Sequence, residues 1–313
     1  MIISASRRTD IPAFYAEWFL HRIKEGYLTV PNPFNPNQIT CVSLRPQDVE
    51  VIVFWTRHPR PIIPYLTDLS RRGYRFYFLY TILHNPRLID PKSPPQRVAV
   101  DTLKKLAQII GPDRVIWRYD PIILTTVTDL EFHTQAYARL AQQLRTHTFR
   151  SVISTVDLYA KAKRRIQDMT KQGVFVRSFD ELEPDRLGRF FQQLARLAHE
   201  NGMELTSCAE KLDLRPYGIR PGKCIDAVYI KKVFDLDLAD KKDPHQRPAC
   251  GCIPSRDIGM YDSCLFGCRY CYATRSFDLA LKNYRQHQPH SPSLLGWSEV
   301  EKNQQLNLFG RRP

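Results

Sequence analysis

Short apolar runs rich in β-branched and aromatic residues alternate with amphipathic stretches over the first two thirds of the chain. Such runs, bounded by turn residues, predict buried strands, and the stretches between them have the spacing of helices. Six strand-then-helix units imply a parallel sheet, and their number and length favour a complete or partial (βα) TIM-like barrel over a doubly wound sheet. The predicted strands are Ile2–Ser6, Val51–Trp55, Arg75–Ile82, Arg114–Tyr119, Ser151–Val156 and Met203–Cys208.

Two of the intervening helices each show one apolar stripe. Apolar residues recur at spacings of three, four and seven over 130–144 and again over 187–197, which predicts that each helix buries one face. Near the start, Pro12 suits the first turn of another helix, with Asp10 as its cap. The chain has neither a Gly-x-Gly-x-x-Gly motif nor a phosphate loop, which argues against a Rossmann fold and a nucleoside triphosphatase.

The pattern changes after about residue 215. Prolines and glycines interrupt the helical spacing, and cysteines become frequent. So many breakers cannot build a core of their own, so we expect metal sites to organise this segment. The predicted parts are a (βα) barrel over 1–215, a cysteine-rich iron-sulfur segment packed on the barrel mouth over 216–285, and a polar, mobile tail over 286–313.

Polar residues gather directly after the predicted strands, where a barrel places its reactive groups. Any single one of them is better explained by a helix cap or a structural ion pair, but the whole set is harder to explain that way. The candidates are Arg7, Arg8 and Asp10 after the first strand, Arg118 and Asp120 after the fourth, and Glu210 after the sixth.

Three cysteines fall within eight residues as Cys264-Leu-Phe-Gly-Cys268-Arg-Tyr-Cys271. The C-x3-C-x2-C spacing offers three thiolates to a [4Fe-4S] cluster and leaves one iron without a protein ligand, which makes an open site for chemistry. Zinc is the alternative, with Asp262 or a distant cysteine as the fourth ligand, and free or redox-active thiols are the third interpretation. The cluster is the preferred interpretation.

Four further cysteines, Cys208, Cys224, Cys250 and Cys252, make one full coordination set. The set predicts either an auxiliary [4Fe-4S] cluster, which we prefer, or a structural zinc ion. Unconnected thiols are the remaining alternative. Cys41 stands alone in a short apolar, strand-like run and is expected to be a core residue.

The formal net charge of +14 is large enough to attract polyanions, and nucleic acid is the usual partner of such an excess. A solvated basic surface on an enzyme of small molecules explains the charge equally well, and two clusters would lower the total to about +11. The chain has no apolar run near the roughly 18 residues of a membrane span and begins without a secretory signal. We therefore expect a cytoplasmic protein whose cysteines are metal ligands or free thiols.

Several longer motifs carry a family resemblance: IISASRRTDIPAFY at the start, VFWTR at 53–57, VIWRYDP at 115–121, SCAEK at 207–211, GKCID at 222–226 and CGCIPSRDIGMYDSCLFGCRYCYA at 250–273. Together they resemble the bacterial and archaeal proteins grouped as domain of unknown function 1848, over nearly the whole chain. That family has no established reaction.

The triplet itself, with Tyr270 before its last cysteine, resembles the signature of the radical S-adenosylmethionine (SAM) superfamily. That resemblance implies a partial (βα)6 barrel, a [4Fe-4S] cluster on Cys264, Cys268 and Cys271, and S-adenosylmethionine chelated to the open iron by its amino and carboxylate groups. One-electron reduction would cleave SAM to a 5′-deoxyadenosyl radical. Superfamily members usually carry the triplet after the first strand, so its place at 264–271 implies a permuted or convergent arrangement.

The leading hypothesis is therefore an iron-sulfur enzyme of radical SAM type, acting on an unknown substrate that is anionic or a nucleic acid. A one-electron donor such as a flavodoxin or ferredoxin is its implied partner, with no membrane. Arg7, Arg8, Arg118 and Glu210 would hold charged groups of substrate or SAM, while Asp10 and Asp120 would orient groups or transfer protons. The alternative is a non-radical barrel metalloprotein that binds nucleic acid and carries structural iron-sulfur or zinc sites.

Overall fold

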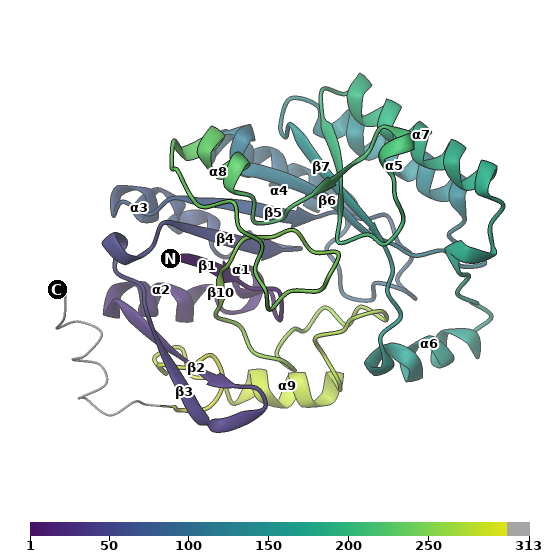
Figure 1. The fold of residues 1–313 in the computed structure, drawn as a ribbon. Helices are drawn as coiled ribbons and strands as arrows, with labels where there is room; N and C mark the ends of the chain where they lie inside the picture. The colour runs from purple at the N-terminus through teal and green to yellow at the C-terminus, as the bar shows by residue number, and fades with distance from the viewer. Residues whose placement is uncertain (299–313) are drawn as a thin grey trace. The chain divides into compact units, whose positions relative to one another are not determined.

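The computed structural model describes residues 1–298 and divides the chain into two compact units. Unit 1 comprises Met1–Phe76, Arg256–Leu265 and the chain from Ala273 onward, and unit 2 comprises Tyr77–Ser255 and Phe266–Tyr272. Each unit is therefore assembled from segments that lie far apart in the sequence (Figure 1). The boundaries differ from the predicted division at 215 and 285.

Unit 1 is built on three parallel strands in the order β10-β1-β4. Ile3 of β1 pairs with Arg256 of β10 on one side and with Ile52 of β4 on the other. A separate antiparallel pair, β2 and β3, has a register irregularity at Pro31 and Asn32. The elements of unit 1 are β1 (Ile2–Ala5), α1 (Ile11–Phe14), α2 (Ala16–Glu25), β2 (Tyr27–Asn32), β3 (Asn35–Ser43), β4 (Val51–Thr56), α3 (Leu66–Arg71), β10 (Arg256–Asp257) and α9 (Phe277–Arg285).

Unit 2 continues the pattern of strand then helix. Its strands are parallel in the order β5-β6-β7-β8-β9, and α5 packs against both α4 and α7. The elements are β5 (Phe76–Thr81, whose first residue belongs to unit 1), α4 (Gln96–Ile110), β6 (Val115–Ile122), α5 (Leu130–Leu144), β7 (Arg150–Thr155), α6 (Lys163–Thr170), α7 (Pro184–Glu200), β8 (Glu204–Cys208), β9 (Arg220–Gly222) and α8 (Ala227–Phe234).

The α/β class with one large parallel sheet is confirmed, and all six predicted strands lie within three residues of their predicted ends. The strand order is β10-β1-β4-β5-β6-β7-β8-β9. Its first and last strands each have one neighbour, so no closed barrel is found among the described strands. The two edge strands are two and three residues long, which is too short to continue the ladder.

Large aromatic side chains fill the core of unit 2 between β6 and α5. Trp117 and Tyr137 stack with ring centroids 4.7 Å apart, and Tyr119 meets Tyr137 edge to face at 5.3 Å. All three rings are fully buried, and the Trp117 indole N–H donates to the Ile82 carbonyl at 3.1 Å. This packing confirms the apolar stripe that predicted helix 130–144.

The predicted tail divides at residue 298. Its first part is held within unit 1, where Trp18 donates its indole N–H to the Ser291 carbonyl at 2.9 Å and the Thr29 hydroxyl donates to the Ser298 carbonyl at 2.6 Å. Residues 299–313 lie outside the described residues. Within the described chain, none of the helices has the length and apolar character needed to span a bilayer.

Candidate functional site

The carboxyl ends of three neighbouring strands in unit 2 carry its three predicted catalytic residues and one predicted metal ligand. Arg118 and Asp120 lie toward the end of β6, and Cys208 ends β8 with Glu210 two residues beyond it. Ser154 and Thr155 end β7 between them. Because parallel strands end at a common edge, residues from distant parts of the sequence meet there, which is where ligands bind in open α/β sheets.

Arg118, Asp120 and Ser154 form a partly buried charged group. The Arg118 guanidinium pairs with Oδ2 of Asp120, and the Ser154 hydroxyl donates to Oδ1 of the same carboxylate. Asp120 is 8% exposed, so the ion pair is only slightly screened by solvent. This arrangement brings together two of the predicted catalytic residues, from one strand, with a hydroxyl from the next.

Glu210 has a positional role in this structure. Its Oε2 accepts hydrogen bonds from both the amide and the hydroxyl of Thr155, each at 2.8 Å, and its Oε1 accepts from the amide of Lys211 at 2.9 Å. The carboxylate thus ties the loop after β8 to the end of β7. The predicted role in holding a substrate charge would compete with these protein donors.

Cys208, Cys224, Cys250 and Cys252 are brought together in unit 2. The sulfurs of Cys208 and Cys224 lie 3.2 Å apart, and Cys252 shares sulfur hydrogen bonds with both Cys224 and Cys250. Cys224, Cys250 and Cys252 are buried, and Cys208 is half-buried. None of the four forms a disulfide, and their sulfurs make one cluster of contacts instead of four scattered residues.

The thiol cluster lies in a positive electrostatic environment. The hydrogen bond with Cys224 lowers the pKa of Cys208 to about 7, and the guanidinium groups of Arg118 and Arg247 act in the same direction. The pKa of Cys224 is raised, first by its hydrogen bond with Cys208. One proton shared between two sulfurs favours a thiolate at Cys208, and thiolate is the form that binds metals.

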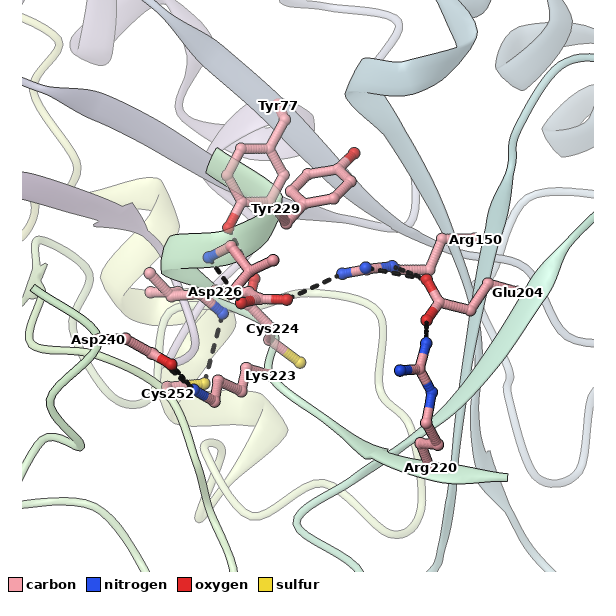
Figure 2. A network of polar contacts seen from close by, with 12 residues as sticks. Tyr77, Arg150, Glu204, Arg220, Lys223, Cys224, Asp226, Tyr229, Asp240 and Cys252 are labelled. Atoms are coloured by element: carbon pink, nitrogen blue, oxygen red, sulfur yellow. Dashed lines mark hydrogen bonds and ion pairs between the residues drawn. The ribbon is translucent and has the colours of Figure 1, made fainter. Parts of the chain in front are cut away.

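A polar network fixes the backbone around Cys224 (Figure 2). The Tyr77 hydroxyl donates to the Cys224 carbonyl at 2.7 Å, and the Ile225 amide donates to the sulfur of Cys252 at 3.4 Å. Ion pairs flank the same segment, joining Lys223 to Asp240 at 2.7 Å and Arg150 to Asp226 at 3.2 Å. The two loops that carry Cys224 and Cys252 are therefore held in register.

Gly222 allows β9 to approach β8 closely beside this cluster. It pairs with Cys208, and a β-carbon added there would lie 2.5 Å from the hydroxyl oxygen of Thr206 and 3.0 Å from the Ser207 carbonyl oxygen. We expect Gly222→Ala to lower the free energy of unfolding by about 1–3 kcal/mol, because β9 must move away from β8. Urea unfolding measures the loss, with the exposed neighbour Pro221→Ala as control; equal midpoints for the two variants would contradict the predicted contact.

Two cysteines of the triplet belong to unit 2, in a segment that is tightly anchored. Tyr270 is buried and donates its hydroxyl to the Asp90 carboxylate, at 3.0 and 3.1 Å from the two oxygens. Arg165, on α6, donates to the carbonyls of Arg269 and Cys271. Asp90 lies in the loop after β5 and α6 follows β7, so Cys268 and Cys271 are positioned by the same edge of the sheet.

Tyr270 thus anchors the segment through a buried carboxylate, since Asp90 is 2% exposed. We expect Tyr270→Phe to lower the free energy of unfolding by about 1–3 kcal/mol, because the buried carboxylate loses its hydroxyl donor. Hydrogen exchange should accelerate most at residues 266–272. Tyr272→Phe is the matched control, since that side chain is 42% exposed and keeps its ring beside Tyr159; unchanged exchange in Tyr270→Phe would refute the anchor.

Cys264, the first cysteine of the triplet, belongs to unit 1. Its neighbour Ser263 accepts a 2.7 Å hydrogen bond from the buried hydroxyl of Tyr15 through its carbonyl. Burial, and next the charge of the Cys264 thiolate, raise the pKa of Tyr15 far above its ordinary value. Tyr15 is therefore a neutral donor beside this cysteine.

Asp257, in β10, is a centre of unit 1 that sequence reasoning missed. Its carboxylate accepts hydrogen bonds from the hydroxyl of Ser6 at 2.6 Å and the amide of Arg7 at 2.8 Å, and it pairs with Arg8 at 3.2 Å. The Arg7 guanidinium lies over the Trp55 ring at 5.1 Å. The one available signal was an acidic residue beside the cysteine-rich motif, and a two-residue strand gives no periodicity.

Asp10 caps α1, as its position before Pro12 predicts. Its two oxygens accept from the amides of Ala13 at 3.0 Å and Arg57 at 2.6 Å, which joins the loop after β1 to the end of β4. Burial raises the pKa of Asp10 to about 6 despite these hydrogen bonds. The predicted proton-transfer residue is thus engaged by backbone amides in this structure.

The cysteine clusters fit metal binding by their chemistry more than by their present geometry. Over residues 1–298, no three or more His, Cys, Asp or Glu side chains already surround one point closely enough to hold a metal ion. The four sulfurs of unit 2 form an open chain of contacts, from Cys208 through Cys224 and Cys252 to Cys250. Buried thiols with an amide N–H directed at a sulfur nevertheless suit metal-bound cysteines.

Comparison with known proteins identifies one family. The family model for a domain of unknown function, DUF1848, matches residues 2–273, which include all of the cysteines discussed above. No curated protein and no solved structure matches the chain. The family match covers most of the chain and agrees with the motifs in the sequence. The chain therefore belongs to the DUF1848 family.

Proposed function

We propose that this chain is an iron-sulfur enzyme of radical SAM type that binds its open-site cluster through Cys264, Cys268 and Cys271. The observation that carries the proposal is the C-x3-C-x2-C triplet. The firm anchoring of Cys268 and Cys271 on loops after β5 and β7 gives it further support. A three-thiolate set leaves one iron open to a ligand that is not protein. We take the parallel sheet as a partial (βα) barrel and place the protein in the cytoplasm, where such a cluster can stay reduced.

The position of each residue in the fold assigns it a role in this proposal. When bound, the cluster with S-adenosylmethionine supplies one-electron chemistry that no side chain can provide. Tyr270 and Arg165 hold the backbone on either side of Cys271, so they position two of the three ligands. Arg118 and Asp120, at the same edge of unit 2, offer a cation for an anionic group and a buried carboxylate for proton transfer.

In unit 1, Arg7 and Arg8 are the proposed contacts for negatively charged parts of substrate or SAM. Asp257 fixes the Arg7 backbone and the Arg8 guanidinium, which limits the positions both side chains can take. A restrained guanidinium loses less entropy when it binds a carboxylate or phosphate. Each unit therefore offers cations at the ends of its own strands.

The test is anaerobic purification with iron and sulfide analysis, coupled to a SAM cleavage assay. We expect brown protein that, with dithionite or a reduced flavodoxin as the one-electron donor, converts S-adenosylmethionine to 5′-deoxyadenosine. Brown protein that leaves SAM intact would contradict the radical proposal and favour a non-radical metalloprotein that binds nucleic acid. Colourless protein that takes up zinc at the triplet would end both iron proposals.

A nucleic-acid partner is the second candidate, and one observation favours it. Lys163 and Arg164 are exposed at the start of α6, the helix whose Arg165 holds the Cys271 carbonyl, and Lys161 is exposed just before it. A basic helix end beside the cysteine segment suits a phosphate backbone. If so, affinity for a short duplex should fall steeply with salt, and the double variant Lys163→Ala, Arg164→Ala should reduce that salt slope; an unchanged slope would exclude this helix as the contact.

A further inference from the structure

The second cysteine set occupies a smaller space than a four-iron cluster needs. We propose that Cys208, Cys224, Cys250 and Cys252 bind a single tetrahedral metal ion of the zinc class. The sequence is compatible with either a [4Fe-4S] cluster or a zinc ion at these four cysteines, and the distances between the sulfurs favour one of the two. The inference concerns unit 2 alone and does not depend on the open-site cluster.

The sulfur–sulfur distance is the first argument. A tetrahedron with Zn–S bonds of about 2.3 Å has edges of about 3.8 Å between its sulfurs. Each cysteine of a four-iron cube binds a different iron and points outward from it, so those sulfurs stand much farther apart. The sulfurs of Cys208 and Cys224 are 3.2 Å apart, so a single ion requires them to separate by only about 0.6 Å.

The other two sulfurs support the same size of site. Cys252 is within hydrogen-bonding reach of the sulfurs of both Cys224 and Cys250, so every member of the set touches another member. Side-chain rotation would close this open chain of contacts onto one ion. A cube would instead require all of the contacting pairs to separate widely, in loops held by the Tyr77, Arg150 and Lys223 interactions.

The surroundings suit four thiolates. The Ile225 amide donates to the sulfur of Cys252, which is the type of contact that tunes metal-bound cysteine. A zinc ion with four thiolates carries a net charge of −2, and burying that charge requires nearby cations. Arg247 lies beside the set, since its carbonyl accepts the amide of Cys250 at 2.9 Å.

The ion would organise a segment with little regular structure of its own. Among the described residues, 235–255 contain no helix or strand, yet Cys250 and Cys252 lie in this stretch. Cys208 ends β8, and Cys224 follows β9. One ion on these four residues would therefore fasten the irregular segment to the edge of the sheet, as structural zinc sites do in loop-rich segments.

The experiment separates the two metal sites by removing one of them. The triple variant Cys264→Ala, Cys268→Ala, Cys271→Ala, as the full chain, cannot hold an open-site cluster, so any metal it keeps reports on the second set. We expect this variant to be colourless and to contain about one zinc per chain without acid-labile sulfide. Replacement with Co²⁺ should give an intense thiolate-to-cobalt charge-transfer band and the visible spectrum of a tetrahedral ion.

Matched variants in the same background complete the test. Adding Cys224→Ser should remove the zinc, whereas adding Cys41→Ser should leave it, because Cys41 lies on the β2–β3 hairpin of unit 1. Should Cys224→Ser fail to fold, Cys252→His keeps a ligand and should retain zinc while weakening the charge-transfer band. Retention of about four irons and four sulfides by the triple variant would overturn the proposal. So would loss of two titratable thiols without metal, since that indicates a Cys208–Cys224 disulfide.

Discussion

Replacing any one of Cys264, Cys268 and Cys271 by alanine is expected to abolish reductive cleavage of S-adenosylmethionine, with 5′-deoxyadenosine formation falling by at least about 1,000-fold. Under the proposed function, the three thiolates act as one unit that holds the cluster. Loss of one ligand leaves two irons without protein and makes the cluster labile. The measurement is product formation per chain under anaerobic conditions, with iron content determined on the same sample.

Cys41→Ala is the matched control, since it removes a half-buried thiol that lies outside both cysteine sets. It should keep full iron content and full activity. The variants must also stay folded: far-ultraviolet circular dichroism of Cys268→Ala and Cys271→Ala should match the unaltered protein, because Tyr270 and Arg165 still anchor the segment. Substantial SAM cleavage by any of the three single variants would show that the triplet is not the site of that reaction.

The strands and main helices of this fold were predictable because, in each of them, the residue types that favour the element are also placed so that its apolar side chains are buried. The run Val115–Ile122 is apolar and β-branched or aromatic where it enters the core, and helix Leu130–Leu144 has one apolar face. The cap at Asp10 was predictable because Asp is a preferred cap and Pro12 suits the first turn of the helix that follows.

The elements that sequence reasoning missed have their cause in tertiary contacts. Only the strand-like run around Cys41 was predicted of the β2–β3 hairpin, because the hairpin contains three prolines, which mark breaks in a sequence but are tolerated in edge strands. Strand β10 exists because Asp257 collects hydrogen bonds from Ser6, Arg7 and Arg8, all of them about 250 positions away. No local pattern contains that information.

The same limit applies to the candidate site. The count of four further cysteines predicted one coordination set; their sulfurs lie in contact, and the set stays a prediction. It could not predict that Glu210 and Asp10 also accept hydrogen bonds from the amides of Thr155 and Arg57, which are distant in the sequence. The sequence position of a charged residue after a strand does not show whether its side chain contacts a ligand or forms hydrogen bonds that hold a loop.

Replacing His133 by alanine is expected to lower the free energy of unfolding by about 2–4 kcal/mol at pH 7. The ring is fully buried between β6 and α5, where its Nδ1 accepts the Tyr119 hydroxyl at 2.9 Å and its Nε2–H donates to the Ile123 carbonyl at 2.9 Å. Alanine leaves a cavity and two buried polar groups without this partner. Urea unfolding measures the effect, and a loss below about 1 kcal/mol would contradict the buried network.

The pH dependence of that loss gives a sharper test, because burial lowers the pKa of His133 to about 4. The unfolded chain takes up the proton near pH 6.5, so between pH 7 and 4 this histidine destabilises the folded state by up to about 3 kcal/mol. Asp10 has the opposite sign: its raised pKa of about 6 gives stability that is present below about pH 4 and is lost as the pH rises through 6.

We therefore expect the difference in stability between His133→Ala and the unaltered protein to shrink on acidification. The corresponding deficit of Asp10→Asn should instead grow, and differences taken at each pH cancel acid effects at the cysteine sites. Parallel pH profiles for the two variants would show that these groups do not titrate as their burial requires.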